Sequence, residues 1–340
     1  MNALSKRVFI AGGTGFLGYA AIQEFVRLGY DIVTIALPNE INTQGLFDEH
    51  VEVMYGNLFL MEEVELVSMF SNSHCERFVY ALGPDDRVSV SGDAWTFFHH
   101  YLVEKSKQII EAAKKAKMKH ATVLSSYFAY FDRQFSGELS KRHPYIRARV
   151  MQQRELATLI EPDHFSVCFL ELPYIFGLME GRKPIWRDAL LDRIDVYPWV
   201  FFPRGGGTAM VDVSDVARAI VAATIYGKAN GKYFIGEQNM TFHTFLKLIQ
   251  QVRPQPKRIL MLPAWLVAIG AKSLQRKHQK EGKESGLNYY WLMKQILSKR
   301  FYYPNQDYKN ELNYQFLGYT GHEDVTNSIQ KTMEACYRKQ

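Results

Sequence analysis

Three glycines near the start of the sequence have a spacing that suits phosphate binding. Gly12, Gly15 and Gly18 lie in the run 12-GGTGFLG-18, between an apolar stretch that predicts a strand and a stretch with helical periodicity. Glycine allows a tight turn and a close approach of backbone to ligand, and a helix N-terminus offers free N–H groups. A tight turn without a ligand would use the same residues, but their placement between strand and helix favours a dinucleotide.

A tyrosine and an arginine further along the chain could handle a proton together. Tyr145 and Arg149 lie four residues apart in 145-YIRAR-149, so a helix would place them one turn apart on one face. A phenol titrates near pH 10, and a nearby cation makes its phenolate accessible at lower pH. The alternative is a surface aromatic residue beside a solvated charge, and the spacing alone leaves both readings open.

Alternating periodicities in the first half of the chain indicate the elements that must position these residues. Strand patterns are predicted at 7–12, 31–37, 51–57, 77–83 and 120–126, and helical patterns at 17–29, 60–70 and 103–116. This alternation predicts a parallel sheet with helices on both faces. A ligand would then bind at the carboxyl ends of the strands.

The second half is less regular but adds further elements. An apolar stretch covers 165–177, helices are predicted at 212–224, 242–252 and 323–339, and a strand at 232–236. Asp212 or Ser214 could cap the first of these helices and Thr241 the second. We therefore expect an α/β protein with a Rossmann-type doubly wound parallel sheet and a smaller α/β C-terminal substrate lobe. The expected domains are 1–170 and 171–340, with segments near 205–235 returning to the first.

Composition and charge argue against several classes of function. The chain has 340 residues, 47% of them hydrophobic, and a net charge of +6. The basic residues are spread along the chain rather than gathered, so no nucleic-acid partner is expected, although 272–280 is a plausible exposed basic segment. The three cysteines fit neither a metal site nor a disulfide framework. With no secretory signal pattern at the N-terminus, we expect a cytoplasmic protein.

One apolar run, 259-ILMLPAWLVAIGA-271, has two possible readings. It is too short to span a bilayer and contains a proline, so no transmembrane segment is expected. A buried helix is the favoured interpretation, and a role at a membrane surface stays open.

The residues after the second predicted strand bear on the choice of dinucleotide. An acidic residue there would bind the ribose hydroxyls of NAD, and an arginine would favour the phosphate of NADP. The sequence reads 35-IALPN-39 and offers neither, and no Lys or Arg follows as far as Gly56. This leans weakly to NAD over NADP, with Asn39 as a possible ribose partner or a loop cap.

Several stretches, taken in order, resemble the extended short-chain dehydrogenase/reductase family of NAD-dependent epimerases, dehydratases and dihydroflavonol-type reductases. The stretches are the glycine run, 56-GNL-58, 79-VYALG-83, 124-LSSYFAYF-131, 205-GGGTAMVDVSDVARAI-220, 231-GKYFIGEQNMTF-242 and 262-LPAWLV-267. The segment 205–220 is typical of the dihydroflavonol-reductase-like branch. The resemblance covers nearly the whole chain, and the order of the motifs is more specific than any one of them.

The resemblance implies a role for each matched residue. In this family a tyrosine exchanges a proton with the substrate oxygen while hydride moves to or from nicotinamide, and a lysine four residues later supports it. The matched positions give Ser126 as the orienting hydroxyl, Tyr145 as acid and base, and Arg149 in place of the lysine. The residues expected to contact the cofactor are Gly12, Thr14, Gly15, Phe16, Leu17, Gly18, Asn57, Leu58, Ala81, Leu82, Gly83 and Pro173.

Four departures from the family pattern bear on activity. Arg149 keeps the charge of the lysine but is larger and planar, while Leu102, Asn57 and Gln153 replace residues that are usually polar or acidic. The resemblance implies an NAD(P)-dependent oxidoreductase or epimerase that acts at a carbinol or ketone carbon of a small, hydrophobic or nucleotide-linked substrate. The departures keep open the alternative of a non-catalytic dinucleotide-binding sensor or scaffold.

Aromatic and basic residues bear on the substrate and on assembly. The aromatic residues of 127–131 could form a substrate wall or fill the core, and Arg182 and Arg204 could bind an anionic group. By analogy with the family, the helices at 103–116 and 145–160 could form the face of a homodimer.

Overall fold

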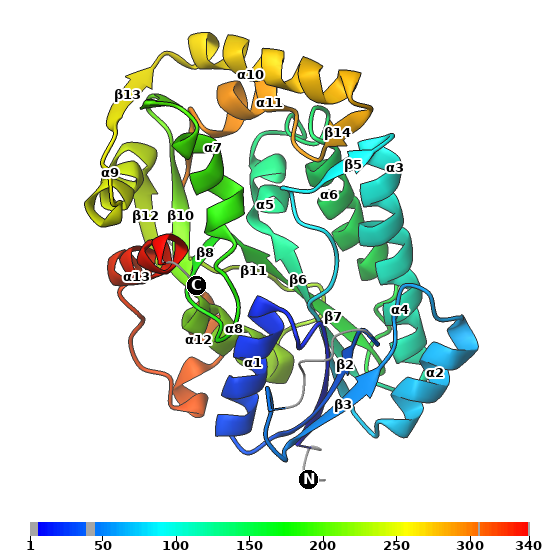
Figure 1. Cartoon of the computed structure of the whole chain (residues 1–340). Coiled ribbons are helices and arrows are strands. Elements are labelled where there is room, and N and C mark those ends of the chain that lie inside the picture. Colours follow the sequence, from blue (N-terminus) through cyan, green and yellow to red (C-terminus); the bar gives the residue numbers. More distant parts are fainter. Residues whose placement is uncertain (1–5, 39–44, 305–306, 339–340) are drawn as a thin grey trace.

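Seven parallel strands form the central sheet of the protein (Figure 1). The computed structural model describes residues 6–38, 45–304 and 307–338. The strand order is β11-β7-β6-β4-β1-β2-β3. The strands are β1 (Arg7–Ala11), β2 (Asp31–Ala36), β3 (Val51–Tyr55), β4 (Arg77–Tyr80), β6 (His120–Ser126), β7 (Ser166–Leu172) and β11 (Lys232–Phe234). The predicted Rossmann-type parallel sheet is confirmed. Apolar runs like those of its strands are typical of parallel sheets that helices cover on both faces.

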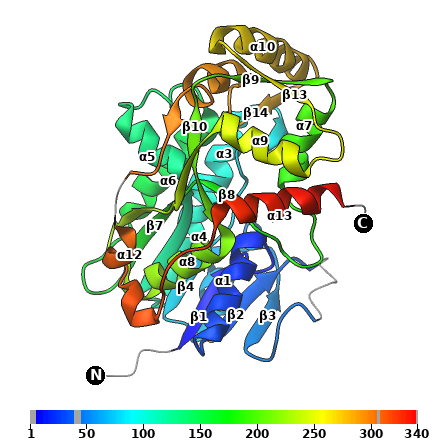
Figure 2. The same cartoon turned by 90° about the vertical axis from the view of Figure 1, so that its left-hand side faces the viewer.

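Helices cover both faces of this sheet (Figure 2). On one face lie α1 (Phe16–Arg27) and α8 (Val213–Tyr226), and on the other α2 (Glu63–Asn72), α4 (Lys105–Lys115) and α6 (Pro144–Ala157). Each layer has its own apolar core. Ile22 and Ile220 belong to the core under α1 and α8, whereas Phe70 and Ile109 belong to the core on the opposite face.

Most of the remaining elements build a smaller lobe beyond the carboxyl ends of the strands, whereas α12 and η5 pack in the layer of α8 (Figures 1 and 2). Its strands are β5 (Ser89–Ser91), β8 (Tyr174–Phe176), β9 (Trp199–Pro203), β10 (Gly207–Asp212), β12 (Gln238–Thr241), β13 (Arg258–Leu262), β14 (Lys283–Ser285) and β15 (Arg300–Phe301). The remaining α-helices of the chain are α3 (Ala94–His99), α5 (Tyr127–Gln134), α7 (Asp192–Asp195), α9 (Phe242–Val252), α10 (Ala264–Lys280), α11 (Tyr289–Trp291), α12 (Tyr308–Glu311) and α13 (Val325–Tyr337). Short π- and 3-10 segments are η2 (His100–Glu104), η3 (Arg187–Leu191), η4 (Leu292–Ile296) and η5 (Tyr314–Leu317).

Side chains cap the starts of α8 and α9 where the sequence predicts. The Asp212 carboxylate accepts a hydrogen bond from the backbone N–H of Ser214 at 2.7 Å. The Thr241 hydroxyl accepts one from the N–H of Thr244 at 3.1 Å. Each bond satisfies a donor that the first turn of a helix leaves without a partner.

The predicted buried helix over 259–271 is wrong. Its first part is strand β13, which pairs with β9 in a two-stranded ribbon, and α10 begins only after Pro263. Proline has no backbone N–H and suits the start of a helix, which explains the break. Within α10 only Ala268 is fully buried, and Trp265 is 60% exposed. Among the described residues no helix is long and apolar enough to cross a membrane.

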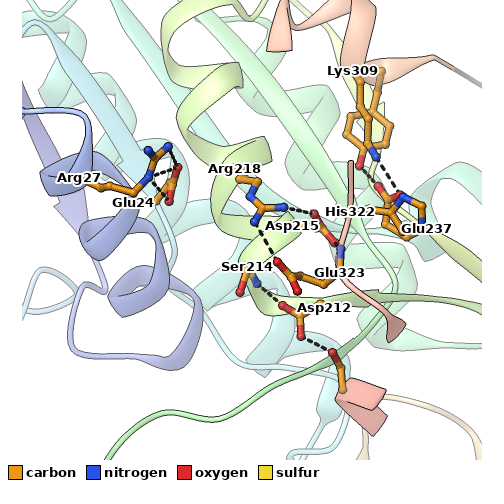
Figure 3. Close-up of polar contacts among 12 residues, drawn as sticks. Glu24, Arg27, Asp212, Ser214, Asp215, Arg218, Glu237, Lys309, His322 and Glu323 are labelled. Atoms are coloured by element: carbon orange, nitrogen blue, oxygen red, sulfur yellow. Dashed lines mark hydrogen bonds and ion pairs between the residues drawn. The ribbon is translucent and has the colours of Figure 1, made fainter. Parts of the chain in front are cut away.

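Polar contacts tie the end of the chain back to the central sheet layer (Figure 3). Arg218 of α8 donates to Asp215 at 2.9 Å and to Glu323 at 3.0 Å. Lys309 of α12 donates to the buried Glu237 at 2.9 Å. The C-terminal segment therefore returns along α8 before α13 packs on the smaller lobe.

Candidate active site

Backbone geometry at the glycine run leaves no room for side chains. Gly12 has φ +93°, and a Cβ there would lie 2.5 Å from the carbonyl oxygen of Ala81 on the neighbouring strand. A Cβ on Gly18 would lie 2.1 Å from the carbonyl oxygen of Gly12. The turn therefore requires glycine at both positions, because other residues would push the helix away from the strand.

The start of α1 fits an anionic group. Gly15 is the N-cap residue, and no side chain hydrogen-bonds to the first turn of the helix. The first N–H groups of α1, beside Phe16 and Leu17, are therefore available to a phosphate, which the helix dipole also favours. Thr14 is buried in the same turn.

The other residues expected to contact the cofactor follow strands of the central sheet. Ala81, Leu82 and Gly83 follow β4, next to β1 in the sheet, and Pro173 follows β7. Because parallel strands end at one edge, all of them lie on the carboxyl side of the sheet. Leu58 is buried in the core after β3.

Asn57 and Leu102, two of the departures from the family pattern, each make a structural contact. The Asn57 side-chain oxygen accepts the N–H of Phe59 at 3.0 Å, so that oxygen caps its own loop. Asn39 lies outside the described residues. Leu102 is fully buried in η2, and a Cβ on Gly83 would lie 2.7 Å from its side chain, so it packs where the family usually has a polar side chain.

Ser126 lies at the junction between sheet and helix. It is the last residue of β6 and the N-cap of α5, and its Oγ accepts the N–H of Phe128 at 3.3 Å. An N-cap hydroxyl uses its oxygen as acceptor and keeps its proton available as a donor. Ser126 can therefore cap the helix and donate a hydrogen bond to a ligand at the same time.

Arg149 and Tyr145 are in direct contact within α6. The Arg149 Nε donates to the Tyr145 hydroxyl oxygen at 3.1 Å, and its Nη1 donates to Leu124 O at 3.2 Å and to Gln152 Oε1 at 3.0 Å. Both side chains are buried, with relative exposures of 7% for Arg149 and 5% for Tyr145. The one-turn spacing predicted from the sequence is thus realised, and it attaches the pair to the strand that ends in Ser126.

The charge of Arg149 is held by neutral acceptors. Among the described residues no carboxylate lies within ion-pair distance of this guanidinium, although its side chain is buried. Burying a charge without a counter-charge is unfavourable, so such a group is typical of a site that binds or stabilises an anion. The adjacent Tyr145 oxygen is the group that could become that anion.

Electrostatics keep Tyr145 protonated in this structure. Burial raises the pKa of Tyr145 above its usual value, and the Arg149 guanidinium opposes the rise. Asp86, in the loop after β4, raises the pKa further. Because the Arg149 Nε occupies the phenol oxygen as acceptor, the phenol proton points elsewhere and is free to be donated.

Asp86 is a residue that the sequence reasoning missed. Burial raises the pKa of its carboxyl to about 6, and the neighbouring Asp85 adds to the rise, while Arg87 and Arg149 oppose it. The same carboxyl acts electrostatically on Tyr127, Tyr145 and Tyr174. The pair 85-DD-86 directly after a buried strand was the available signal, since polar residues at strand ends line the ligand edge.

Tyr80, at the end of β4, also belongs to these surroundings. Its hydroxyl is buried and has no hydrogen-bond partner within the described part of the chain. Burial raises the pKa of Tyr80, and Arg149 opposes the rise. A buried phenol without a partner is uncommon, and here it lies within the electrostatic reach of Arg149.

A buried polar network supports the site from behind. Gln153 of α6 donates to Ser125 Oγ at 3.1 Å and to Glu171 Oε1 at 2.8 Å. Arg133 donates to the same Glu171 at 2.8 Å. The amide thus joins α6, β6 and β7, so the departure at 153 has a structural role.

The aromatic residues after Ser126 belong mainly to the core. Tyr127, Phe128 and Phe131 are buried, and the Tyr127 hydroxyl contacts Thr208 Oγ1 at 3.1 Å. Tyr130 is half-buried against Phe234. Of the two readings of this cluster, core packing is the one that the contacts support. Arg182 and Arg204 are both exposed.

Comparison with known families decides the classification. Residues 8–236 match the NAD dependent epimerase/dehydratase family. The chain belongs to this family. The prediction of NAD is confirmed at the level of the family, and no curated protein matches the chain.

Solved structures of this fold cover nearly the whole chain. The crystal structure of gox2253 has a TM-score of 0.73 at 18% identity, with 96% of this chain and 97% of that chain covered. The Bordetella bronchiseptica enzyme WbmH in complex with NAD+ has a TM-score of 0.64 at 14% identity, with 95% and 96% covered. UDP-glucose-4-epimerase from Stenotrophomonas maltophila, with bound NAD and formylated UDP-arabinopyranose, has 0.65 at 13%, with 97% of each chain covered. These likenesses establish the epimerase/dehydratase fold.

Proposed function

We propose that this member of the epimerase/dehydratase family is an NAD-dependent oxidoreductase or epimerase that acts at a carbinol or ketone carbon. The observation that carries the proposal is the buried Arg149. Its Nε contacts the Tyr145 oxygen at 3.1 Å, and no carboxylate in the described part of the chain pairs with its charge. Family membership does not favour the alternative of a non-catalytic sensor.

Each side chain then has a defined task. Tyr145 gives its proton to the oxygen of a carbonyl substrate, and Arg149 stabilises the phenolate that remains. Ser126 donates a hydrogen bond to the same substrate oxygen and fixes its orientation. NAD, held by the glycine turn and the start of α1, would supply or accept the hydride at the carbon.

The protonated state of Tyr145 suits the reduction of a carbonyl compound. A phenol whose pKa is raised is a proton donor at neutral pH, and donation is the step that carbonyl reduction needs. In the opposite direction the phenolate must form first, and Arg149 provides the charge for it. We therefore propose reduction of a carbonyl compound as the first activity to assay.

Replacement of Tyr145 by Phe tests the proposal. NADH oxidation with a panel of carbonyl compounds, and epimerisation of a panel of nucleotide sugars, are the two activities to assay. Whichever activity the original chain has is expected to fall by about 100-fold or more in Tyr145→Phe. Binding of NADH, measured by calorimetric titration, should stay unchanged. Tyr130→Phe on α5 serves as the matched control and should keep turnover near that of the original chain.

Two results would contradict the proposal. Equal turnover in Tyr145→Phe and the original chain would remove the tyrosine from the chemistry. Binding of NADH with neither NADH oxidation nor epimerisation of any compound in the panel would favour the sensor.

A further inference from the structure

The outer surface of the smaller lobe carries a group of exposed apolar side chains. On α10, Trp265 is 60% exposed, Leu266 43% and Ile269 59%. On the neighbouring ribbon, Trp199 is 49% exposed and Phe201 46%. Large apolar side chains gathered on one part of a surface are unfavourable in water and typically mark a contact with another apolar phase.

Successive side chains along β9 point to opposite faces of the ribbon that β9 forms with β13. Val200 is buried and Phe202 packs against the core of the lobe, so Trp199 and Phe201 must point outward. Their rings lie 6.2 Å apart between centroids. α10 follows β13 after Pro263 and packs along β9, so the apolar residues of helix and ribbon belong to adjoining elements.

The exposed face of α10 changes character along its length. Trp265, Leu266 and Ile269 occupy its first two turns. The later turns contain the exposed Leu274 and four exposed basic residues, which are Lys272, Arg276, Lys277 and Lys280. The helix has these four basic side chains and no acidic one. Within the described ranges none of the four forms an ion pair, so their charge is available to an external partner.

We propose that this face, formed by α10 and the ribbon of β9 and β13, docks on a lipid bilayer that carries anionic headgroups. The apolar residues enter the boundary between headgroups and acyl chains, and the basic residues of the same helix bind the headgroups. Exposed aromatic and aliphatic side chains combined with basic ones on a helix lying flat on the surface are the features of interfacial helices.

Two other occupants fit the face less well. A nucleic acid would use the basic residues but would leave Leu266 and Ile269 in water. A second copy of the chain could cover the apolar residues, but a two-fold contact through α10 would bring two helices of like charge together. An anionic bilayer satisfies both kinds of side chain at once.

The position of the face connects it to the candidate active site. β14 follows α10 directly, and the carbonyl oxygen of Gly286, just after β14, accepts the backbone N–H of Tyr145 at 3.0 Å. Docking through α10 would therefore hold the segment that packs on Tyr145 close to the bilayer. The docking itself does not depend on the proposed reaction and can be measured without turnover.

Co-sedimentation with lipid vesicles tests the proposal. The full chain is mixed with vesicles of phosphatidylcholine alone and with vesicles that also contain phosphatidylglycerol. Binding is expected to be about tenfold or more stronger to the second, and to weaken as salt is raised, since salt screens the headgroup charge. The double variant Trp265→Ser with Ile269→Ser should weaken binding to both vesicles, and Arg276→Glu with Lys277→Glu should remove the preference for phosphatidylglycerol.

A matched control comes from an exposed apolar pair elsewhere on the molecule. Leu60, just before α2, is 79% exposed, and Val64, in its first turn, is 80% exposed. Leu60→Ser with Val64→Ser should leave vesicle binding unchanged. The proposal is overturned when the original chain binds neither vesicle, or when the α10 variants bind like the original. It is also overturned when light scattering shows a dimer that the Trp265 and Ile269 variant dissociates, because a second copy then covers the face.

Discussion

Arg149 makes three hydrogen bonds that a shorter or differently shaped cation could not all reproduce. Its Nε faces Tyr145, and its Nη1 reaches both Leu124 O and Gln152 Oε1. A guanidinium is planar and spreads its donors over a fixed fork, whereas an ammonium is a compact point charge. Arg149 therefore holds its charge beside Tyr145 in a geometry that a lysine could not reproduce.

Arg149→Lys is expected to lower turnover by about tenfold or more and stability by roughly 1–3 kcal/mol, because a buried acceptor would lose its donor. Turnover assays and urea unfolding measure the two effects. Arg154→Lys, on the exposed side of the same helix, should change neither. Higher turnover in Arg149→Lys would mean that the arginine impairs a chemistry that lysine would serve better.

Asp86 predicts a particular dependence of stability on pH. Its folded pKa of about 6 lies above the ordinary value, so the folded state holds the proton more firmly than the unfolded state between about pH 4 and pH 6. Stability contributed by this group is therefore lost as pH rises through that window. Because Asp86 is half-buried, solvent screens its charge, and we expect the change in the free energy of unfolding to be roughly 1–2 kcal/mol.

Asp86→Asn should accordingly be more stable than the original chain at pH 7 and no more stable at pH 4. Urea unfolding at both pH values measures the difference. Asp85→Asn is the control: Asp85 accepts from Arg87 at 2.9 and 3.0 Å, so its loss should give no gain at pH 7. An equal gain for Asp86→Asn at both pH values would exclude ionisation as the cause.

At the scale of elements, two helices contain a glycine in opposite surroundings. In α1 a Cβ on Gly18 would lie 2.1 Å from backbone, whereas in α10 a Cβ on Gly270 would meet nothing within 4 Å. The first glycine keeps α1 against the turn after β1. The second only exposes backbone and adds freedom to the unfolded chain.

The same substitution should therefore have opposite effects in these helices. Gly18→Ala is expected to lower stability by about 1–3 kcal/mol and to weaken NAD binding, because α1 must move away from the turn. Gly270→Ala should raise stability by roughly 0.5–1 kcal/mol and leave NAD binding unchanged. Thermal unfolding and calorimetric titration give both quantities, and NAD binding by Gly18→Ala at the original affinity would contradict the phosphate role of the turn.

At the scale of the whole molecule, one buried carboxylate holds the C-terminal segment against the rest of the chain (Figure 3). Glu237 has a side-chain exposure of 7% and accepts from Lys309 at 2.9 Å and from the Tyr308 hydroxyl. Without it, a buried hydroxyl and a partly buried cation would lose their acceptor.

Glu237→Ala should lower stability by about 2–4 kcal/mol. Hydrogen exchange should become faster first in 307–324, the segment that this contact holds. Glu334→Ala is the control, because Glu334 is about half exposed and faces Arg338 only at 4.0 Å. Uniform acceleration of exchange over the whole chain would show that Glu237 supports global rather than local stability.

Local spacing in the sequence determined the central sheet, the glycine turn and the placement of Tyr145 and Arg149 on one helical face. These features follow from backbone geometry, which repeats with a fixed period and needs no knowledge of distant residues. The cap residues Asp212 and Thr241 belong to the same class, since each contacts a backbone group within its own turn.

Only the tertiary structure decided which side chains are buried and what surrounds them. The rise in the pKa of Asp86, the missing counter-charge of Arg149 and the exposure of α10 all depend on elements that pack from elsewhere in the chain. An apolar run such as 259–271 has the same composition in a core as on a surface. What differs is the set of neighbours that cover it, and the sequence of the run itself does not contain them.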